Sequence, residues 1–157
     1  MILYHGSNTA IEKIDLSFSN PFKDFGLAFY LSPDREQAQR LADVKAIKSG
    51  GIAVVSSFEF DEQLLTSSTF KVKTFDGYSQ EWAEFIYSNR DEQQSFVHPF
   101  DIVYGPIADD YIGLQIINYK RQYITFKEFL RKIKYHKGIT FQYAFCTQNA
   151  INQLSKI

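Results

Sequence analysis

The sequence predicts an α+β fold in a single domain, residues 1–157. The chain has the usual length of one domain, and 45% of its residues are hydrophobic, which is enough to build a core. Short apolar runs typical of strands are interspersed with segments typical of helices. There is no strict strand–helix–strand rhythm and no Gly-x-Gly-x-x-Gly motif, so an α+β arrangement is favoured over a doubly wound parallel sheet.

Six segments have the residue types of strands. They are rich in β-branched and aromatic side chains, which favour extended backbone. The first is expected to end at Gly6 and the fifth to close at Gly105-Pro106, because glycine and proline mark turns. The predicted strands cover residues 2–5, 27–31, 52–60, 70–75, 102–104 and 142–145.

The first predicted helix follows the second strand. Ser32 is a suitable N-cap and Pro33 fits the first helical position. The helix is expected to end before Gly50-Gly51, since glycine commonly follows a helix. Ala38, Leu41 and Ala42 have the spacing of one helix face and are the expected core contacts.

Three further helices are expected along the chain. Residues 79–89 place Trp82, Phe85 and Ile86 on one face. A second helix begins with the capping box formed by Thr125 and Glu128 and is expected to end at Gly138. Thr147 caps the third, a short helix near the end of the sequence.

The charge of the chain is nearly balanced but unevenly distributed. The formal net charge is −1, so nucleic-acid binding does not follow from the total. Between Asn118 and Lys137, however, there are seven basic residues and a single acid, Glu128. Such a run is either the solvated face of a helix or a contact surface for a phosphate-bearing partner.

Cysteine usage and the N-terminal residues predict the compartment. A single cysteine, Cys146, allows no intramolecular disulfide and fits a reducing environment. No basic segment followed by an apolar run begins the sequence, and no stretch approaches the ~20 apolar residues that span a bilayer. We therefore expect a cytoplasmic protein without membrane contact, although export by a route without an N-terminal signal stays open.

Two short motifs carry the candidate chemistry. His5-Gly6-Ser7 stands at the end of the first predicted strand, and Tyr30 lies on the second. The three histidines, His5, His98 and His136, are far apart and have no His or Cys at ligand spacing, so no metal site is predicted. Alone, His5 would be an ordinary structural histidine and Tyr30 a core residue; their combination favours a ligand pocket.

In these motifs the sequence resembles the ADP-ribosyltransferase superfamily, in the branch of diphtheria toxin and the poly(ADP-ribose) polymerases. That branch ends a first strand in His-Gly-Ser or His-Gly-Thr and carries Phe-Gly-x-Gly-x-Tyr on a second. Here the second motif runs from Phe25 to Tyr30, with Ala28 in place of the second glycine. The resemblance implies an ADP-ribosyltransferase-like fold, with two packed, mostly antiparallel small sheets and flanking helices around an NAD cleft.

The whole chain is also similar to a bacterial domain family of uncharacterised function within this superfamily. Five motifs match in order, and together they span nearly the full length. They are Tyr4 to Ser7, Asp24 to Tyr30, Trp82 to Arg90, Asp101 to Asp110, and Gln142 to Phe145.

The resemblance assigns roles to the pocket residues. It implies that His5 binds the adenosine ribose hydroxyls and that Gly6 pairs with the nicotinamide carboxamide, because no Cβ intervenes. Tyr30 is expected to stack on the nicotinamide ring. Arg90 is expected to meet the pyrophosphate or the acceptor through its bidentate fork. The full set expected to hold NAD is His5, Gly6, Ser7, Phe25, Gly26, Tyr30, Ser32 and Arg90.

The position of the expected catalytic acid is occupied by an amide. Enzymes of this branch place a glutamate on a late strand, where its charge stabilises the oxocarbenium-like transition state; here the matching residue is Gln142. Three interpretations stay open: a slow transferase, an acid supplied from elsewhere, or an NAD-binding pseudoenzyme. Asp109 and Asp110 are the candidates for the supplied acid. They follow a strand and the Gly105-Pro106 turn, so a position at a sheet edge is expected, and their mutual repulsion predicts a raised pKa in one of them. The alternative is a polar turn or a helix-capping pair.

The resemblance therefore predicts an NAD-dependent mono-ADP-ribosyltransferase, with His5, Tyr30, Gln142, Asp109 and Asp110 as catalytic residues. NAD serves as co-substrate, and the acceptor is a protein, RNA or DNA. A bacterial toxin or phage-defence effector with an antitoxin or chaperone partner fits this class. The alternatives are an NAD glycohydrolase and a catalytically weak module that binds NAD or ADP-ribose.

Overall fold

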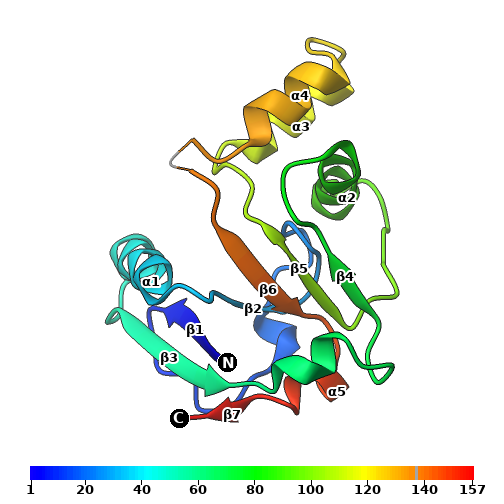
Figure 1. Ribbon diagram of the computed structural model, residues 1–157. Helices are drawn as coiled ribbons and strands as arrows, with labels where there is room; N and C mark the ends of the chain where they lie inside the picture. The colour runs from blue at the N-terminus through cyan, green and yellow to red at the C-terminus, as the bar shows by residue number, and fades with distance from the viewer. Residues whose placement is uncertain (137) are drawn as a thin grey trace.

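The computed structural model describes residues 1–136 and 138–157. Two separate sheets form its framework (Figure 1). The first, called the N-terminal sheet, has the strand order β1-β3-β7 and is antiparallel throughout. It consists of β1 (Ile2–Ser7), β3 (Val54–Glu59) and β7 (Ser155–Lys156).

The second sheet, called the central sheet, has the order β2-β6-β5-β4. Its pairs β2–β6 and β6–β5 are antiparallel, and β5–β4 is parallel. The predicted α+β class, with two small and mostly antiparallel sheets, is confirmed. The strands are β2 (Phe29–Leu31), β6 (Phe141–Phe145), β5 (Ile102–Pro106) and β4 (Val72–Thr74).

Within the described residues, one backbone bridge joins the two sheets. Tyr4 of β1 and Ser32, which follows β2, exchange two N–H to C=O hydrogen bonds of 2.8 Å each. The next residue on β1, His5, and the last-but-one residue of β2, Tyr30, therefore come together at this joint. The bridge places the two predicted pocket motifs side by side.

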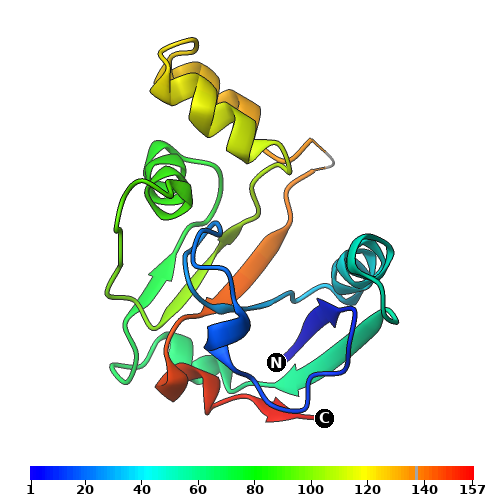
Figure 2. The same ribbon diagram turned by 180° about the vertical axis from the view of Figure 1, so that it is seen from behind.

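Helices cover the two sheets separately (Figures 1 and 2). Helix α1 (Arg35–Ser49) packs on β1 and β3. Helices α2, α3 and α4 form a group beyond the central sheet, where α3 and α4 lie side by side. Short 3-10 turns follow Asp15 and Asp61. The remaining bounds are α2 (Gln80–Arg90), α3 (Ile112–Lys120), α4 (Phe126–Ile133), α5 (Gln148–Ile151), and the 3-10 turns Leu16–Phe18 and Glu62–Leu65.

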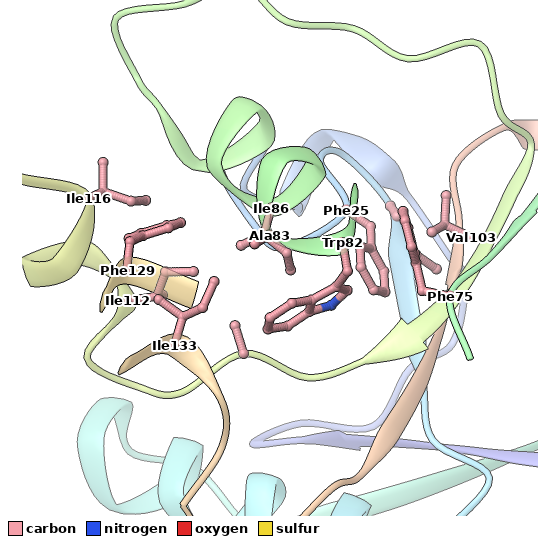
Figure 3. Packing of buried hydrophobic residues seen from close by; sticks show 13 residues of the cluster. Phe25, Phe75, Trp82, Ala83, Ile86, Val103, Ile112, Ile116, Phe129 and Ile133 are labelled. Atoms are coloured by element: carbon pink, nitrogen blue, oxygen red, sulfur yellow. The ribbon is translucent and has the colours of Figure 1, made fainter. Parts of the chain in front are cut away.

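Two aromatic-rich cores hold these elements in place. One lies between the sheets, where Leu3, Phe58 and Phe145 are buried. The other lies between the central sheet and helices α2 to α4, around the fully buried Trp82 (Figure 3). Trp82 also donates its indole N–H to the carbonyl of Pro106 at 3.0 Å, so it ties α2 to the end of β5.

The start of α1 differs from the prediction. Asp34 is the N-cap and accepts from the Glu36 N–H, whereas Ser32 and Pro33 precede the helix. Leu41 is 47% exposed, and only Ala38 and Ala42 are buried. The physical reason is close packing: at Gly6 strand β1 lies so near α1 that only small side chains fit between them.

Two other boundaries are corrected by tertiary contacts, and one helix was missed. Strand β5 runs through Gly105-Pro106, because β6 pairs with both residues. Helix α4 ends at Ile133 and not at Gly138, since Lys134 turns extended and forms a bridge with Ala108. Helix α3 was not predicted, because its N-cap Tyr111 makes no side-chain capping bond.

Candidate functional site

His5 is half-buried at the joint between the sheets, where two contacts fix its orientation. Its ring stacks on Phe29, with centroids 4.5 Å apart, and its Nδ1 lies 2.7 Å from the carbonyl oxygen of Tyr30. Burial, followed by the positive charge of Lys45, lowers the pKa of His5 to about 4. The imidazole is therefore neutral near pH 7. Because a carbonyl can only accept, Nδ1 carries the proton and Nε2 is an acceptor.

Tyr30 is held through its hydroxyl. It donates to the carbonyl of Gly26 at 2.7 Å and accepts from the backbone N–H of Phe25 at 3.1 Å. Burial, with a contribution from the nearby Asp24 carboxylate, raises the pKa of this phenol well above its ordinary value. The side chain is therefore a neutral, immobile ring, which suits stacking better than proton transfer.

Two lysines contact the pocket residues. Lys23 Nζ lies 5.0 Å from the centroid of the Tyr30 ring, and Lys45 Nζ donates to the carbonyl of Gly6 at 2.7 Å. Burial lowers the pKa of both, to about 8 for Lys45, and each is further affected by a neighbouring positive charge. Partly desolvated ammonium groups that repel one another form a site that favours an anion.

Asp24 is the hub of a buried hydrogen-bond network. Its Oδ1 accepts from Nε and Nη2 of Arg90, at 2.9 and 2.6 Å. Its Oδ2 accepts from the backbone N–H of Ala108 and from Nε2 of Gln142, both at 3.1 Å. Asp24 thereby joins the end of α2, the exit of β5 and the late strand β6 at one point.

This network changes the expectation for Arg90 and Gln142. Two nitrogens of Arg90 bind Asp24 instead of facing an open surface. Gln142 occupies the predicted late-strand position, and its amide N–H₂ is directed at a carboxylate. The structure therefore places a negative charge beside Gln142, and that charge belongs to Asp24 rather than to Asp109 or Asp110.

The structure explains why each of the two motifs contains a glycine. A Cβ on Gly6 would lie 2.0 Å from the carbonyl oxygen of Ala38, so strand and helix could not pack as they do. Gly26 has φ +78°, and a Cβ there would meet Asn89 Oδ1 at 2.7 Å. Gly6 lies two positions after Tyr4, so its backbone groups face the same edge of β1, away from β3.

The side chains of three further residues predicted to bind the cofactor are buried in the protein or hydrogen-bonded within it. The Phe25 side chain is fully buried in the core beside Phe75. Ser7 is buried within the N-terminal sheet. Ser32 Oγ donates to Gln37 Oε1 at 2.6 Å and accepts from the Asp34 N–H at 2.9 Å. Their role in binding NAD stays a prediction, and for Phe25 it would require a backbone contact.

Asp109 and Asp110 are not a matched pair. Asp110 is exposed, whereas Asp109 is buried and bonded to His136 Nδ1 at 2.7 Å and to the Tyr111 N–H at 2.9 Å. Burial alone would raise the pKa of Asp109, but these hydrogen bonds outweigh it and hold the pKa below its ordinary value. The expectation of a raised pKa is therefore wrong for Asp109.

Two surface hollows lie away from these residues. One, of about 480 Å³, is lined by residues that include the acids Glu59, Asp61 and Glu62. The other, of about 390 Å³, lies between Ile14 and Lys156. Neither includes His5 or Tyr30. We place the candidate site at the His5–Tyr30 joint because buried, oriented and charged groups converge there, while the NAD cleft itself stays a prediction.

No group of three or more metal-binding side chains comes together within the described residues. Over the same part of the chain, none of the helices has the length and apolar character needed to cross a membrane.

Sequence reasoning found His5, Tyr30 and Gln142 but missed three charged partners. Asp24 was identified only as the first residue of the motif Asp24 to Tyr30. Lys23 precedes it directly, and Lys45 lies on the face of α1 that meets β1. A lysine one helical turn after the buried Ala42 was the available signal for Lys45. No local signal marks Asp24, whose partners lie 66 to 118 residues away.

Comparison with known proteins gives one match. The model of a family described as "Protein of unknown function (DUF3990)" matches residues 1–155. No curated protein and no solved structure matches the chain. Since the family model covers nearly every residue, the chain belongs to the DUF3990 family.

Proposed function

We propose that this protein binds NAD⁺ at the His5–Tyr30 joint and transfers its ADP-ribose, as a mono-ADP-ribosyltransferase, to a macromolecule, either a protein, RNA or DNA. The observation that carries the proposal is the neutral His5, fixed by the Tyr30 carbonyl so that Nε2 is left as an acceptor. A ribose hydroxyl is a donor that such a nitrogen accepts from.

The surrounding groups suit the other parts of a dinucleotide. The Tyr30 ring supplies a fixed aromatic surface for nicotinamide, worth about 0.5–1.5 kcal/mol beyond area burial. Lys23 and Lys45 supply positive charge for the diphosphate. Lys45 now binds the Gly6 carbonyl, so the carboxamide of nicotinamide must displace it to pair with that backbone.

Gln142 and Asp24 together take the place of a catalytic glutamate in this proposal. When the bond between ribose and nicotinamide breaks, positive charge develops on the ribose. The Gln142 amide N–H₂ points to Asp24, which leaves Oε1 for a ribose hydroxyl. The hydrogen bond to a carboxylate polarises the amide and strengthens Oε1 as an acceptor. A full charge at this point is missing, so we expect slow turnover and no chain elongation.

An NAD- or ADP-ribose-binding module is the second candidate, and one observation favours it. Both oxygens of Asp24 are occupied, and Arg90 neutralises its charge. If the ion pair persists with ligand bound, little negative charge reaches the ribose. The proposal of a toxin or phage-defence role with an antitoxin or chaperone partner rests on the resemblance to ADP-ribosyltransferases alone.

Incubation with labelled NAD⁺ and a cell lysate tests the proposal, with NAD⁺ affinity measured separately by calorimetry. We expect labelled macromolecule from the wild type and a loss of both binding and labelling in His5→Ala and Tyr30→Ala. Tyr123→Ala, at a 70% exposed tyrosine, is the matched control and should behave as wild type.

The outcomes separate the candidate functions. Free ADP-ribose without labelled macromolecule would show an NAD glycohydrolase. Binding without nicotinamide release would show a binding module. Wild-type binding in both His5→Ala and Tyr30→Ala would place the NAD site elsewhere and overturn the proposal.

A further inference from the structure

A second histidine is oriented by a buried carboxylate outside the pocket. His136 Nδ1 lies 2.7 Å from Asp109 Oδ2, and the two side chains are 58% and 7% exposed. Because the carboxylate can only accept, Nδ1 carries the proton of this hydrogen bond, and Nε2 is left as the nitrogen that can bind a further proton. The exposed imidazole can therefore receive a proton from a molecule in solution while Asp109 holds its orientation.

The segment that carries His136 is fixed to the exit of β5 at both ends. Asp109 donates its N–H to the carbonyl of Ile133 at 2.8 Å, and Ile107 donates to the carbonyl of Thr140 at 2.9 Å. The residue between them, Ala108, donates to Asp24. Asp109, which holds His136, is thus the sequence neighbour of Ala108, a member of the network that contains Gln142.

Exposed basic side chains lie on and just after helix α4, which precedes His136 in the sequence. Helix α4 buries Phe129 and Ile133 and leaves basic side chains exposed, and Lys134 follows the helix directly. The only acid of α4, Glu128, is held in the capping box by Thr125, and its single negative charge stands against four exposed basic side chains. Lys137, also in the basic run, lies outside the described residues. The exposed basic residues are Lys127, Arg131, Lys132 and Lys134.

We propose that His136, oriented by Asp109, is the base that deprotonates a hydroxyl or amino group of a nucleic-acid acceptor whose phosphates lie along α4. The inference rests on the proposed function, because it concerns the second half of the same transfer. His136 would be a catalytic residue and Asp109 a positioning residue.

The step balances without a further reactant. The bond from ribose C1 to the nicotinamide nitrogen breaks, and its electron pair leaves with neutral nicotinamide. The acceptor oxygen or nitrogen then bonds to C1, and its proton passes to His136 Nε2 and on to solvent. The products are ADP-ribosylated nucleic acid, nicotinamide and one proton.

The base also restricts the acceptor chemistry. A carboxylate nucleophile is already deprotonated near pH 7 and gains nothing from a base, whereas a hydroxyl or amine does. An ester of ADP-ribose with a carboxylate is cleaved by neutral hydroxylamine. We therefore expect a hydroxylamine-resistant linkage on nuclease-sensitive material.

The decisive variant is His136→Asn, whose amide N–H₂ replaces the Nδ1 donor to Asp109 but provides no basic nitrogen. We expect transfer to nucleic acid to fall about 10²-fold or more, with NAD⁺ affinity unchanged. His136→Ala should lose the same activity and recover part of it with added imidazole, which a purely structural histidine would not do.

Substitutions that remove or keep the charge of Asp109 test its positioning role. Asp109→Asn should lower kcat with little change in KM for NAD⁺, and Asp109→Glu should restore part of the rate. The paired substitution of Arg131 and Lys132 to Gln should weaken labelling of nucleic acid, most strongly at low salt. The same change at Arg35 and Lys48, exposed on α1, is the matched control.

Several results would overturn the inference while the proposed function stands: wild-type transfer by His136→Asn, no rescue by imidazole, or label that protease or hydroxylamine removes. If the wild type neither binds nor cleaves NAD⁺, the proposed function fails first. Measuring nicotinamide release and macromolecular label in the same samples keeps the two failures distinct.

Discussion

The side-chain amide of Gln142 donates a hydrogen bond to Oδ2 of Asp24 across 3.1 Å, between residues 118 positions apart. The same carboxylate binds Arg90 through its other oxygen. A partly buried ion pair between Asp24 and Arg90 therefore lies beside the late strand of the central sheet, next to the position where the sequence offers only an amide.

Asp24→Asn is expected to destabilise the protein substantially. It leaves the Arg90 guanidinium in a half-buried position without its counter-charge, and removal of one partner of a buried pair costs about 3–5 kcal/mol. Because Arg90 keeps some contact with solvent, we expect the lower end, about 3 kcal/mol, in urea unfolding. Asp43→Asn on the exposed face of α1 should change stability by less than about 0.5 kcal/mol. Equal effects of the two variants would show that the network contributes little.

His5 should make stability depend on pH in the acid range. Its folded pKa of about 4 lies below the unfolded value of 6.5, so the unfolded chain binds the extra proton between these values. The stability that the neutral ring provides is present above pH 6.5 and is lost as the pH falls towards 4. In His5→Asn, which keeps a donor to the Tyr30 carbonyl, the free energy of unfolding should vary less over that window. Identical pH profiles for wild type and variant would argue against the burial of His5.

Gly6→Ala should disrupt the packing of β1 against α1. The added methyl would overlap the backbone carbonyl of Ala38, and overpacking of this kind costs about 1–3 kcal/mol or more. Gly113→Ala on α3 is the control, because its Cβ would meet nothing within 4 Å and alanine favours a helix by about 0.8–1.0 kcal/mol. The midpoint of thermal unfolding should fall for Gly6→Ala and rise for Gly113→Ala. A neutral Gly6→Ala would mean that the strand and helix are not in such close contact.

Tyr30→Phe separates the structural role of this residue from its binding role. Loss of the hydroxyl leaves the Gly26 carbonyl without its donor and should cost about 1–3 kcal/mol of stability. The ring remains, so NAD⁺ affinity measured by calorimetry should change less than twofold, or about 0.4 kcal/mol. Tyr123→Phe at the surface should affect neither quantity. A large loss of affinity in Tyr30→Phe would assign the hydroxyl itself to the ligand.

Local chemistry made most helices predictable. The capping box of Thr125 and Glu128 and the cap at Thr147 are found where the sequence predicts them, because a cap depends on residues within one turn. Helix α3 begins at Tyr111 without such a cap and left no comparable signal. The end of α4 depends on the bridge between Lys134 and Ala108, a contact across the fold that periodicity does not contain.

The sequence predicted those residues of the candidate site that stand in short motifs, where the residue type itself indicates a use. His5 and Tyr30 stand in short motifs, and the structure brings them into contact. Asp24 and His136 acquire their roles only from partners that the fold brings to them. A carboxylate or imidazole in isolation carries no information about which distant donor will meet it, so these roles needed coordinates.

Strand β6 occupies the middle of the central sheet although it is formed by residues near the end of the chain. Until residues 141–145 have been synthesised, β2 and β5 have no strand between them, and Gln142 is absent from Asp24. A growing chain on the ribosome therefore carries open strand edges and no complete site, and the time spent in that state favours aggregation. The proposed NAD site would therefore be complete only after strand β6 has been synthesised and has paired with β2 and β5.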